Sequence, residues 1–473
     1  MAETTFPAGT QYALTVSIPE NYGGMTASML QRSRAFVRHA GVEVTILTYD
    51  HDTDYDATRA WLRERGALID GMHVLNMWDQ LRTWNDDVLR GMQAALAFGV
   101  PDDFRPLGDR GRAVTALKRE LVGAAGLPVQ IDYFRPDGSL LLSDQRLGPE
   151  SANRRVVLCD AAGQPLGAWS EMYPLYAFWL DQLPRDPVAW MIIDSKSSAN
   201  MMIHYQRPDV ALLHVVRGSH LKSGPGSPVE RDLVGTRAPA MLSLEAFDSV
   251  VLLTRRQRED IEARFGPREN ISVIPNSRIM PTALTHLRRK RGYGVMLASL
   301  DGRKRIGHAV RAMARAKQLL PRRRLRLDVW GQGPFEASLN TLIAKLRAPV
   351  RLCGHSPHAA DAFSTASFSL LTSRAEAFGN VLIESMGRGC IPISYDMPYG
   401  PSDIITDGVD GFLVPDGDVE ALARQIAHIA TLSRRELIAM RKAAFRRGQD
   451  FNDERAVERW SALMSGIAKL RGF

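Results

Sequence analysis

The sequence predicts an α/β protein with two Rossmann-like halves that face a cleft, and with a β-rich insertion in the first half. Two observations carry this prediction. Short apolar runs alternate with helical stretches in both halves, and this alternation is interrupted between about residues 100 and 180. Such alternation is typical of βαβ units, which build a parallel sheet. A chain of 473 residues has room for two or three domains.

The first half begins with a strand, a tight turn, a helix and a second strand. The apolar run at residues 13–19 is followed by the turn Asn21-Tyr22-Gly23-Gly24, a helical stretch at 25–39 and an apolar run at 42–49. This order predicts the first βαβ unit of a parallel sheet. Further buried strands are expected at residues 190–194, 209–216 and 249–254.

The segment from about 100 to 180 has a different pattern, in which apolar runs are joined by turn sequences. Arg135-Pro136-Asp137-Gly138 lies within the run at 129–142, and Ala162-Gly163 lies within the run at 156–169. Pro, Asp and Gly between apolar runs are typical of hairpin turns. We therefore expect an inserted antiparallel sheet here.

The second half repeats the alternation after a polar, charged stretch at residues 287–292, where we expect the domain boundary. The predicted strands are 293–300, 325–331, 350–353, 368–372 and 391–395, and the predicted helices are 306–320, 335–346, 381–387 and 419–432. The expected division is an N-terminal domain at 1–285, a C-terminal domain at 286–455 and a C-terminal helix at 456–473. Ligands of open α/β sheets bind beyond the carboxyl ends of the strands, so the predicted site is the cleft between the halves.

The composition is that of an ordinary globular protein, and it excludes the disordered, fibrous and disulfide-stapled classes. Lys and Arg number 60 against 52 acidic residues, a net charge of +8. This modest excess fits an anionic substrate or a membrane surface. The chain lacks the aromatic-interleaved basic clusters of nucleic-acid-binding modules, so no nucleic-acid partner is expected.

The cysteines and the apolar runs bear on the compartment. Cys159, Cys353 and Cys390 have no paired spacing, which is typical of a reducing compartment and argues against a zinc site. We find no signal-peptide pattern and no apolar run near the ~18 residues needed to cross a bilayer, so we expect a cytoplasmic protein. The arginine-rich stretch at 434–447 leaves two alternatives open, a solvated helix face or a peripheral contact with the inner face of the membrane.

The most informative stretch is residues 373–392, SRAEAFGNVLIESMGRGCIP. Glu376 is expected at the end of a strand, and Phe378-Gly379-Asn380 turns the chain into a helix that carries Glu384 in its first turn. Unpaired N–H groups at such a helix start favour phosphate, and Gly379 lets the backbone approach a ligand closely. On spacing alone a second interpretation is equally open, in which Glu384 complements the helix dipole and Glu376 is solvated.

The element EAFGNVLIE, with the Ser-Met-Gly-Arg-Gly-Cys-Ile-Pro that follows it, resembles the E-x7-E motif of the retaining, nucleotide-sugar glycosyltransferases of family 4. That family has the GT-B fold. The stretch at 395–417 resembles a narrower branch, the teichoic-acid α-glycosyltransferases, which modify poly(glycerol or ribitol phosphate), and their relatives that glycosylate serine-rich adhesins. That branch carries a β-rich insertion that assembles subunits. The resemblance therefore implies that the insertion of this chain can form a homo-oligomer.

The resemblance also implies roles for individual residues. Glu376 would hold hydroxyls of the donor sugar and support charge at the reacting centre, and Glu384 would bind the ribose of the nucleotide. No metal and no other cofactor is expected. The backbone groups that would contact the sugar and the diphosphate belong to Phe378, Gly379 and Asn380, and the glycine loop facing the diphosphate would be Gly23-Gly24.

The basic pair of the family is an Arg followed five residues later by a Lys, after the first strand of the second domain. Lys304 matches the Lys and is expected to bind the diphosphate; a solvated loop lysine is the alternative. Ser299 stands where the family has Arg. The sequence offers Arg303 and Arg305 as groups that could reach the diphosphate instead.

A histidine of the first domain contacts the donor sugar in this family. His214 lies inside an apolar run and is expected in the core, whereas His220 follows the strand and is the candidate for the cleft. Asp50, Asp52, Asp54 and Asp56 contain the D-x-D pattern of metal sites. Because they precede a helix near Ala57, we expect them to favour the helix dipole instead.

The resemblance implies a retaining transfer of glucose or N-acetylglucosamine from a UDP-sugar to hydroxyls of an anionic polyol-phosphate polymer, with a protein acceptor as the other option. A different class stays open because of Ser299: a non-catalytic partner subunit that binds acceptor and stabilises an active glycosyltransferase.

Overall fold

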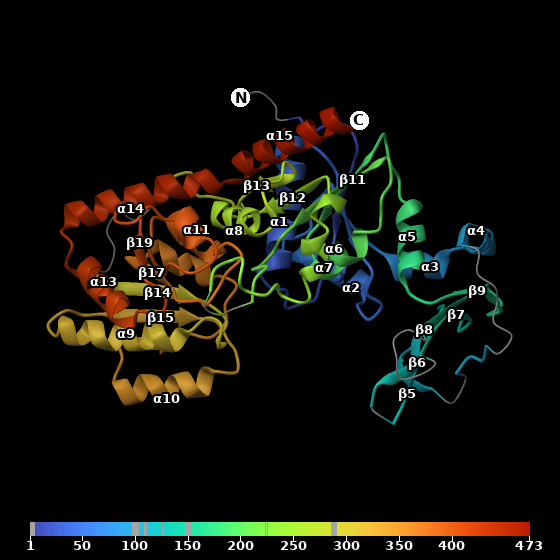
Figure 1. The fold of residues 1–473 in the computed structure, drawn as a ribbon. Coiled ribbons are helices and arrows are strands. Elements are labelled where there is room, and N and C mark those ends of the chain that lie inside the picture. Colours follow the sequence, from blue (N-terminus) through green and yellow to red (C-terminus); the bar gives the residue numbers. More distant parts are fainter. Residues whose placement is uncertain are drawn as a thin grey trace.

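The computed structural model describes residues 5–96, 104–107, 111–124, 126–146, 154–222, 224, 226–284 and 291–473. Within these ranges the chain forms two parallel sheets and one antiparallel sheet (Figure 1). This confirms the predicted α/β class with a β-rich insertion. The predicted domain boundary at 285/286 and the start of the insertion near residue 100 lie outside the described residues.

The first parallel sheet has the strand order β13-β12-β11-β10-β1-β2-β3. Its central strands are buried along their whole length, as apolar runs covered on both faces by helices require. The strands are β1 (Thr10–Leu14), β2 (Val44–Thr48), β3 (Met72–Asn76), β10 (Ala189–Ile193), β11 (Val210–Val215), β12 (Ser249–Leu252) and β13 (Ile271–Val273). The main helices between them are α1 (Gly24–Ala40), α2 (Tyr55–Glu64), α6 (Lys196–Met202) and α8 (Arg255–Phe265).

The expectation of a first strand at residues 13–19 is wrong at both ends. β1 begins at Thr10, because Thr10 and Gln11 pair with β10 despite being polar. It ends at Leu14, and the apolar Ile18 is fully buried in the loop that follows. Burial of a loop residue therefore extended the apolar run beyond the strand.

The antiparallel sheet contains six strands in sequential order, β4 to β9. They are β4 (Arg112–Thr115), β5 (Lys118–Val122), β6 (Pro128–Phe134), β7 (Leu140–Arg146), β8 (Arg154–Cys159) and β9 (Pro165–Trp169). The two expected hairpins are confirmed, with Gly138 and Gly163 at positive φ in their turns. Figure 1 shows this sheet in teal, apart from the parallel sheets and beyond α3 (Met77–Thr83), α4 (Asp86–Leu96) and α5 (Tyr173–Asp181).

The second parallel sheet has the order β16-β15-β14-β17-β18-β19. Its strands are β14 (Tyr293–Leu297), β15 (Arg326–Trp330), β16 (Val350–Leu352), β17 (Phe368–Leu371), β18 (Ile391–Tyr395) and β19 (Phe412–Val414). The helices are α9 (Ile306–Leu319), α10 (Glu336–Leu346), α11 (Asn380–Met386), α12 (Pro401–Ile404), α13 (Val419–Thr431) and α14 (Arg434–Gly448). β14 stops at Leu297, three residues before the expected end, because Leu300 is buried in the loop.

The last helix, α15 (Asp453–Arg471), follows α14 and returns to the first half, where it packs on α1 (Figure 1). Gln31 of α1 donates to Asp453 at 2.7 Å, and the ring of Trp460 lies 5.8 Å from that of Phe36. On α14, Arg441 is fully buried, so the arginine-rich stretch is not a uniform surface patch. In the part of the chain that the structure describes, no helix is both long and apolar enough to span a membrane.

Candidate functional site

Two loops at the carboxyl ends of neighbouring strands bring Lys304 and Glu376 together. The loop after β14 carries Lys304 and the loop after β17 carries Glu376, and Nζ of the lysine lies 2.5 Å from Oε1 of the glutamate. Ser373 donates to the same oxygen at 2.7 Å. The charged groups of this pair are partly exposed, which leaves them accessible to a ligand.

Glu376 lies five residues beyond the last residue of β17, so the expectation that it sits at the strand end needs correction. Two backbone hydrogen bonds fix the position of Glu376 in this loop. Its N–H donates to Pro398 at 3.2 Å, and its carbonyl accepts from Tyr399 at 3.0 Å. The carboxylate is therefore carried by a loop that is fastened to the segment after β18.

The turn Phe378-Gly379-Asn380 leads into α11 through a left-handed glycine. Gly379 has φ 93°, a conformation that residues with a Cβ rarely adopt. Across the turn, a Cβ on Gly400 would lie 1.6 Å from the carbonyl oxygen of Phe378. Two glycines thus permit the backbone of Phe378, which is itself buried, to pass close to the next loop.

The glycine loop of the first half meets this turn. A Cβ on Gly24 would lie 3.7 Å from Nδ2 of Asn380, and the same amide donates to Ser28 of α1 at 3.1 Å. Gly23 precedes α1, a helix of 17 residues without a side-chain cap, and both glycines are exposed. Free N–H groups at such a helix start favour an anion. The predicted Gly23-Gly24 loop and the predicted Phe378–Asn380 turn therefore lie side by side.

Glu384 lies in the second turn of α11 rather than in the first, because the helix begins at Asn380. Its Oε1 accepts from Nε of Arg278 at 2.8 Å. Arg278 belongs to the segment that leaves the first sheet, and nothing in the sequence singled it out. Both side chains are partly exposed, so the pair can open toward a ligand.

Asp301 organises the loop that contains Ser299 and Arg303. It accepts from Ser299 at 2.8 Å and from the guanidinium of Arg303 at 2.9 Å. Burial opposes ionisation of Asp301, but these hydrogen bonds outweigh it and lower its pKa to about 2. Arg303 is thus held by Asp301, while Arg305 donates to the carbonyl of Thr372 at 2.8 Å and pairs with Asp416.

The two candidate histidines are both buried. His214 lies in β11 with its ring 5.2 Å from that of Phe247, in the core as expected, and burial lowers its pKa to about 4. His220 follows β11, but it is fully buried and stacked on Tyr399, with ring centroids 6.1 Å apart. Burial and then nearby arginines, Arg231 first, lower its pKa to about 4. His220 thus reaches the Glu376 loop through the ring of Tyr399.

The aspartates of the D-x-D pattern have separate partners. Asp54 caps α2 by accepting from the N–H groups of Asp56 and Ala57, both at 3.0 Å. Asp50 accepts from Thr53 and Tyr55, and Asp52 pairs with Lys118 of the inserted sheet at 3.1 Å. This arrangement favours the helix-start interpretation of these residues.

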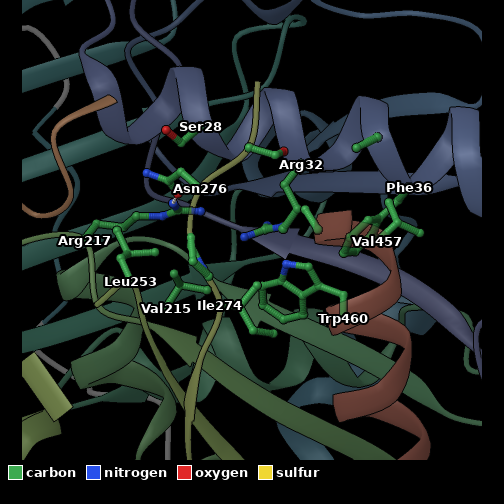
Figure 2. Close-up of a pocket in the computed structure, with 14 residues that line it drawn as sticks. Ser28, Arg32, Phe36, Val215, Arg217, Leu253, Ile274, Asn276, Val457 and Trp460 are labelled. Carbon is green, nitrogen blue, oxygen red and sulfur yellow. Dashed lines mark hydrogen bonds between the residues drawn. The ribbon is translucent and has the colours of Figure 1, made fainter. Parts of the chain in front are cut away.

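A buried polar chain links the first half to the turn before α11, and sequence reasoning missed it. Asp194, at the end of β10, accepts from Arg32 at 2.7 Å and from Arg217 at 2.6 Å. Arg217 also donates to Asn276, whose amide donates to Asn380 at 2.9 Å. Figure 2 shows Arg32, Arg217 and Asn276 converging on a small cavity of about 20 Å³ between α1 and α15. A carboxylate directly after a buried strand was the only available signal.

Comparisons with known proteins place this geometry in context. Residues 292–431 match the family model described as Glycosyl transferases group 1. The poly(glycerol-phosphate) alpha-glucosyltransferase of Bacillus subtilis is 20% identical over 521 residues, covering 97% of this chain and 75% of that protein. An exopolysaccharide phosphotransferase of Streptomyces coelicolor is 35% identical over 202 residues, covering 41% of this chain and only 21% of that longer protein.

Among solved structures, a mutant of S. aureus TarM in complex with UDP, alpha-GlcNAc-glycerol and fondaparinux superposes with a TM-score of 0.71 at 17% identity. The match covers 97% of this chain and 100% of that one. At this identity the likeness shows a shared fold.

Proposed function

Because this chain contains a glycosyltransferase group 1 domain and has the GT-B fold, we propose that it transfers a hexose from a UDP-sugar to an acceptor hydroxyl, with retention of configuration. The observation that carries this proposal is the Lys304–Glu376 pair. Glu376 lies four residues before Asn380, whose amide contacts the start of α1. In this proposal the cation, the carboxylate and the N–H groups at the start of α1 act on one donor.

Each group has a role in such a transfer. When the sugar leaves the diphosphate, negative charge develops on the leaving phosphate, and preorganised donors stabilise it. Lys304 and the N–H groups behind Gly23-Gly24 supply that stabilisation in our proposal. Glu376 holds the sugar, Glu384 binds the ribose once Arg278 releases it, and no metal is needed. His220 supports the Glu376 loop from beneath Tyr399.

The proposed donor and acceptor rest on the relatives and on charge. The complexed TarM structure contains UDP and alpha-GlcNAc-glycerol, and the Bacillus relative is named for glucose and poly(glycerol phosphate). We therefore propose glucose or N-acetylglucosamine as the sugar and a polyol-phosphate polymer as the acceptor. A net charge of +8 favours an anionic polymer of this kind.

The test is release of UDP from a panel of UDP-sugars, with and without poly(glycerol phosphate) or poly(ribitol phosphate). We expect one sugar to be consumed only when acceptor is present, and Glu376→Gln to reduce this turnover at least about 100-fold. Glu269→Gln, an exposed change of the same kind, is the matched control. Proton NMR of the product reports retention through the anomeric configuration.

Undiminished turnover in Glu376→Gln would refute the site. A folded protein that binds the acceptor polymer but releases UDP from no sugar would favour the non-catalytic partner subunit, and co-purification with an active glycosyltransferase would then be the next measurement.

A further inference from the structure

A second cavity, of about 280 Å³, lies where loops of the two halves meet beside Glu376. The first half contributes Lys222 and Arg231 to its lining, and the second half contributes Arg305, Arg374 and Asp416. Four basic side chains and one carboxylate thus surround one space. Such an excess of positive charge favours an anionic occupant.

The acidic groups near the cavity are already engaged. Asp416 pairs with Arg305, and Lys222 pairs with the exposed Asp232 at 3.1 Å. The buried Nε of Arg231 has no acceptor among the described residues. The exposed guanidinium of Arg374 likewise has no hydrogen-bond or ion-pair partner within the described ranges. The guanidinium of Arg374 therefore has hydrogen-bond donors available at the cavity, which suits a ligand that supplies acceptor oxygens.

Arg305 has an unusual backbone conformation, and several contacts fix its side chain at the cavity. It has φ 46°, in the left-handed region that residues other than glycine rarely adopt. Its guanidinium stacks over the ring of Tyr395 at 5.0 Å and donates to the carbonyls of Thr372 and Ser373. A guanidinium held in this way is oriented before a ligand arrives, which lowers the entropy cost of binding.

The cavity adjoins the reacting region but does not include Lys304 or Gly23-Gly24, the groups that stabilise the diphosphate in the proposed transfer. Ala375 and Pro398 belong to its lining, and the carbonyl of Pro398 accepts from the N–H of Glu376. Lys304 and Gly24 do not line it. A ligand here would therefore approach Glu376 from a side other than that of the proposed diphosphate.

From these contacts we propose that the cavity binds a phosphodiester of the acceptor polymer and so places a neighbouring polyol hydroxyl at Glu376. One guanidinium group can donate two parallel hydrogen bonds to two oxygens of a phosphate. A cavity of this volume accommodates one phosphate with its adjoining carbons. This inference rests on the proposed function, since it assigns the acceptor side of the same reaction. The other source of the same chemistry is the donor diphosphate, and the experiment separates the two.

The experiment compares Arg374→Gln and Arg231→Gln with the matched control Arg322→Gln. Arg322 is exposed and lies beyond the far end of α9, whose first residue adjoins Arg305. Titration calorimetry measures binding of poly(glycerol phosphate) and, separately, of UDP, and steady-state turnover gives KM for polymer and for UDP-sugar. Thermal unfolding confirms that each variant is folded. We expect the two cavity variants to weaken polymer binding and raise the polymer KM about tenfold, with UDP binding unchanged.

Three outcomes would overturn the inference: absence of polymer binding to the native chain, equal polymer binding in the cavity variants and Arg322→Gln, or a loss confined to UDP. The last would assign the cavity to the donor diphosphate. Weakened polymer binding in a protein that releases UDP from no sugar would uphold the cavity while refuting the proposed transfer.

Discussion

The two halves share one architecture, but the candidate polar side chains are partly exposed in the second half and enclosed in the first. In the second half, the charged candidates Lys304, Glu376 and Glu384 sit on loops or a helix face and remain partly exposed. In the first half, Asp194 and His220 are fully enclosed. In the proposed function the second half therefore presents side chains to the donor, whereas the first half presents backbone at Gly23-Gly24 and supports it with buried pairs.

Because of this difference, we expect substitutions in the two halves to have different effects on turnover and on stability. Removing a loop carboxylate in the second half should abolish turnover without unfolding the chain. Removing a buried group in the first half should unfold the chain before any effect on catalysis can be measured.

The largest expected effect on stability is that of Asp194→Asn. This change leaves Arg32 and Arg217 buried with their shared counter-charge removed, and loss of one member of a buried charge cluster costs about 3–5 kcal/mol. The free energy of unfolding in urea measures it. The control is Asp209→Asn, which breaks a more exposed bond to Arg185 and should cost about 1 kcal/mol or less. Equal losses in the two variants would contradict the enclosed, paired state of Asp194, because Asp209 belongs to the same half but is more exposed.

The same contrast explains how much the sequence could predict. Apolar alternation was sufficient for the parallel sheets, and Pro-Asp-Gly chemistry was sufficient for the hairpin around Gly138. The predicted ends of the strands near Ile18 and Leu300 were wrong, because a buried loop residue is apolar in the same way as a buried strand residue.

For the site, a contiguous motif placed Glu376, Gly379 and Glu384 in one segment. The partners of those residues could not be predicted, because they come from distant parts of the chain. Arg278 is 106 positions from Glu384, and the stacking of His220 on Tyr399 joins the two halves. Such pairs depend on how the halves dock, which local patterns do not encode.

A second prediction concerns acid. Burial lowers the pKa of both His214 and His220 to about 4, so between about pH 6.5 and 4 the unfolded chain binds protons that the folded chain does not. Stability is therefore fully present above about pH 6.5 and falls as the pH decreases, by roughly 3 kcal/mol for each histidine.

His214→Phe tests this dependence, since it removes one titrating group from the core of the first half. We expect the difference in unfolding free energy between about pH 7.5 and about pH 5 to shrink relative to the native chain. His308→Phe, at a half-buried site in the second half, is the control and should change that difference less. A pH dependence that is identical in all three proteins would show that His214 does not titrate as its burial requires.

The smallest expected effect probes the contact between the halves. The hydroxyl of Tyr399 donates to Asp260 of α8 at 2.6 Å, and burial followed by this bond raises the pKa of the tyrosine, so the phenol keeps its proton. A double-mutant cycle of Tyr399→Phe and Asp260→Asn should give a coupling of about 1–2 kcal/mol. The matching cycle at Arg256 and Asp396, a half-exposed pair that also joins the halves, should give about 0.5 kcal/mol or less. If the Tyr399 cycle shows no coupling, the hydrogen bond to Asp260 does not fasten the Glu376 loop to the first half.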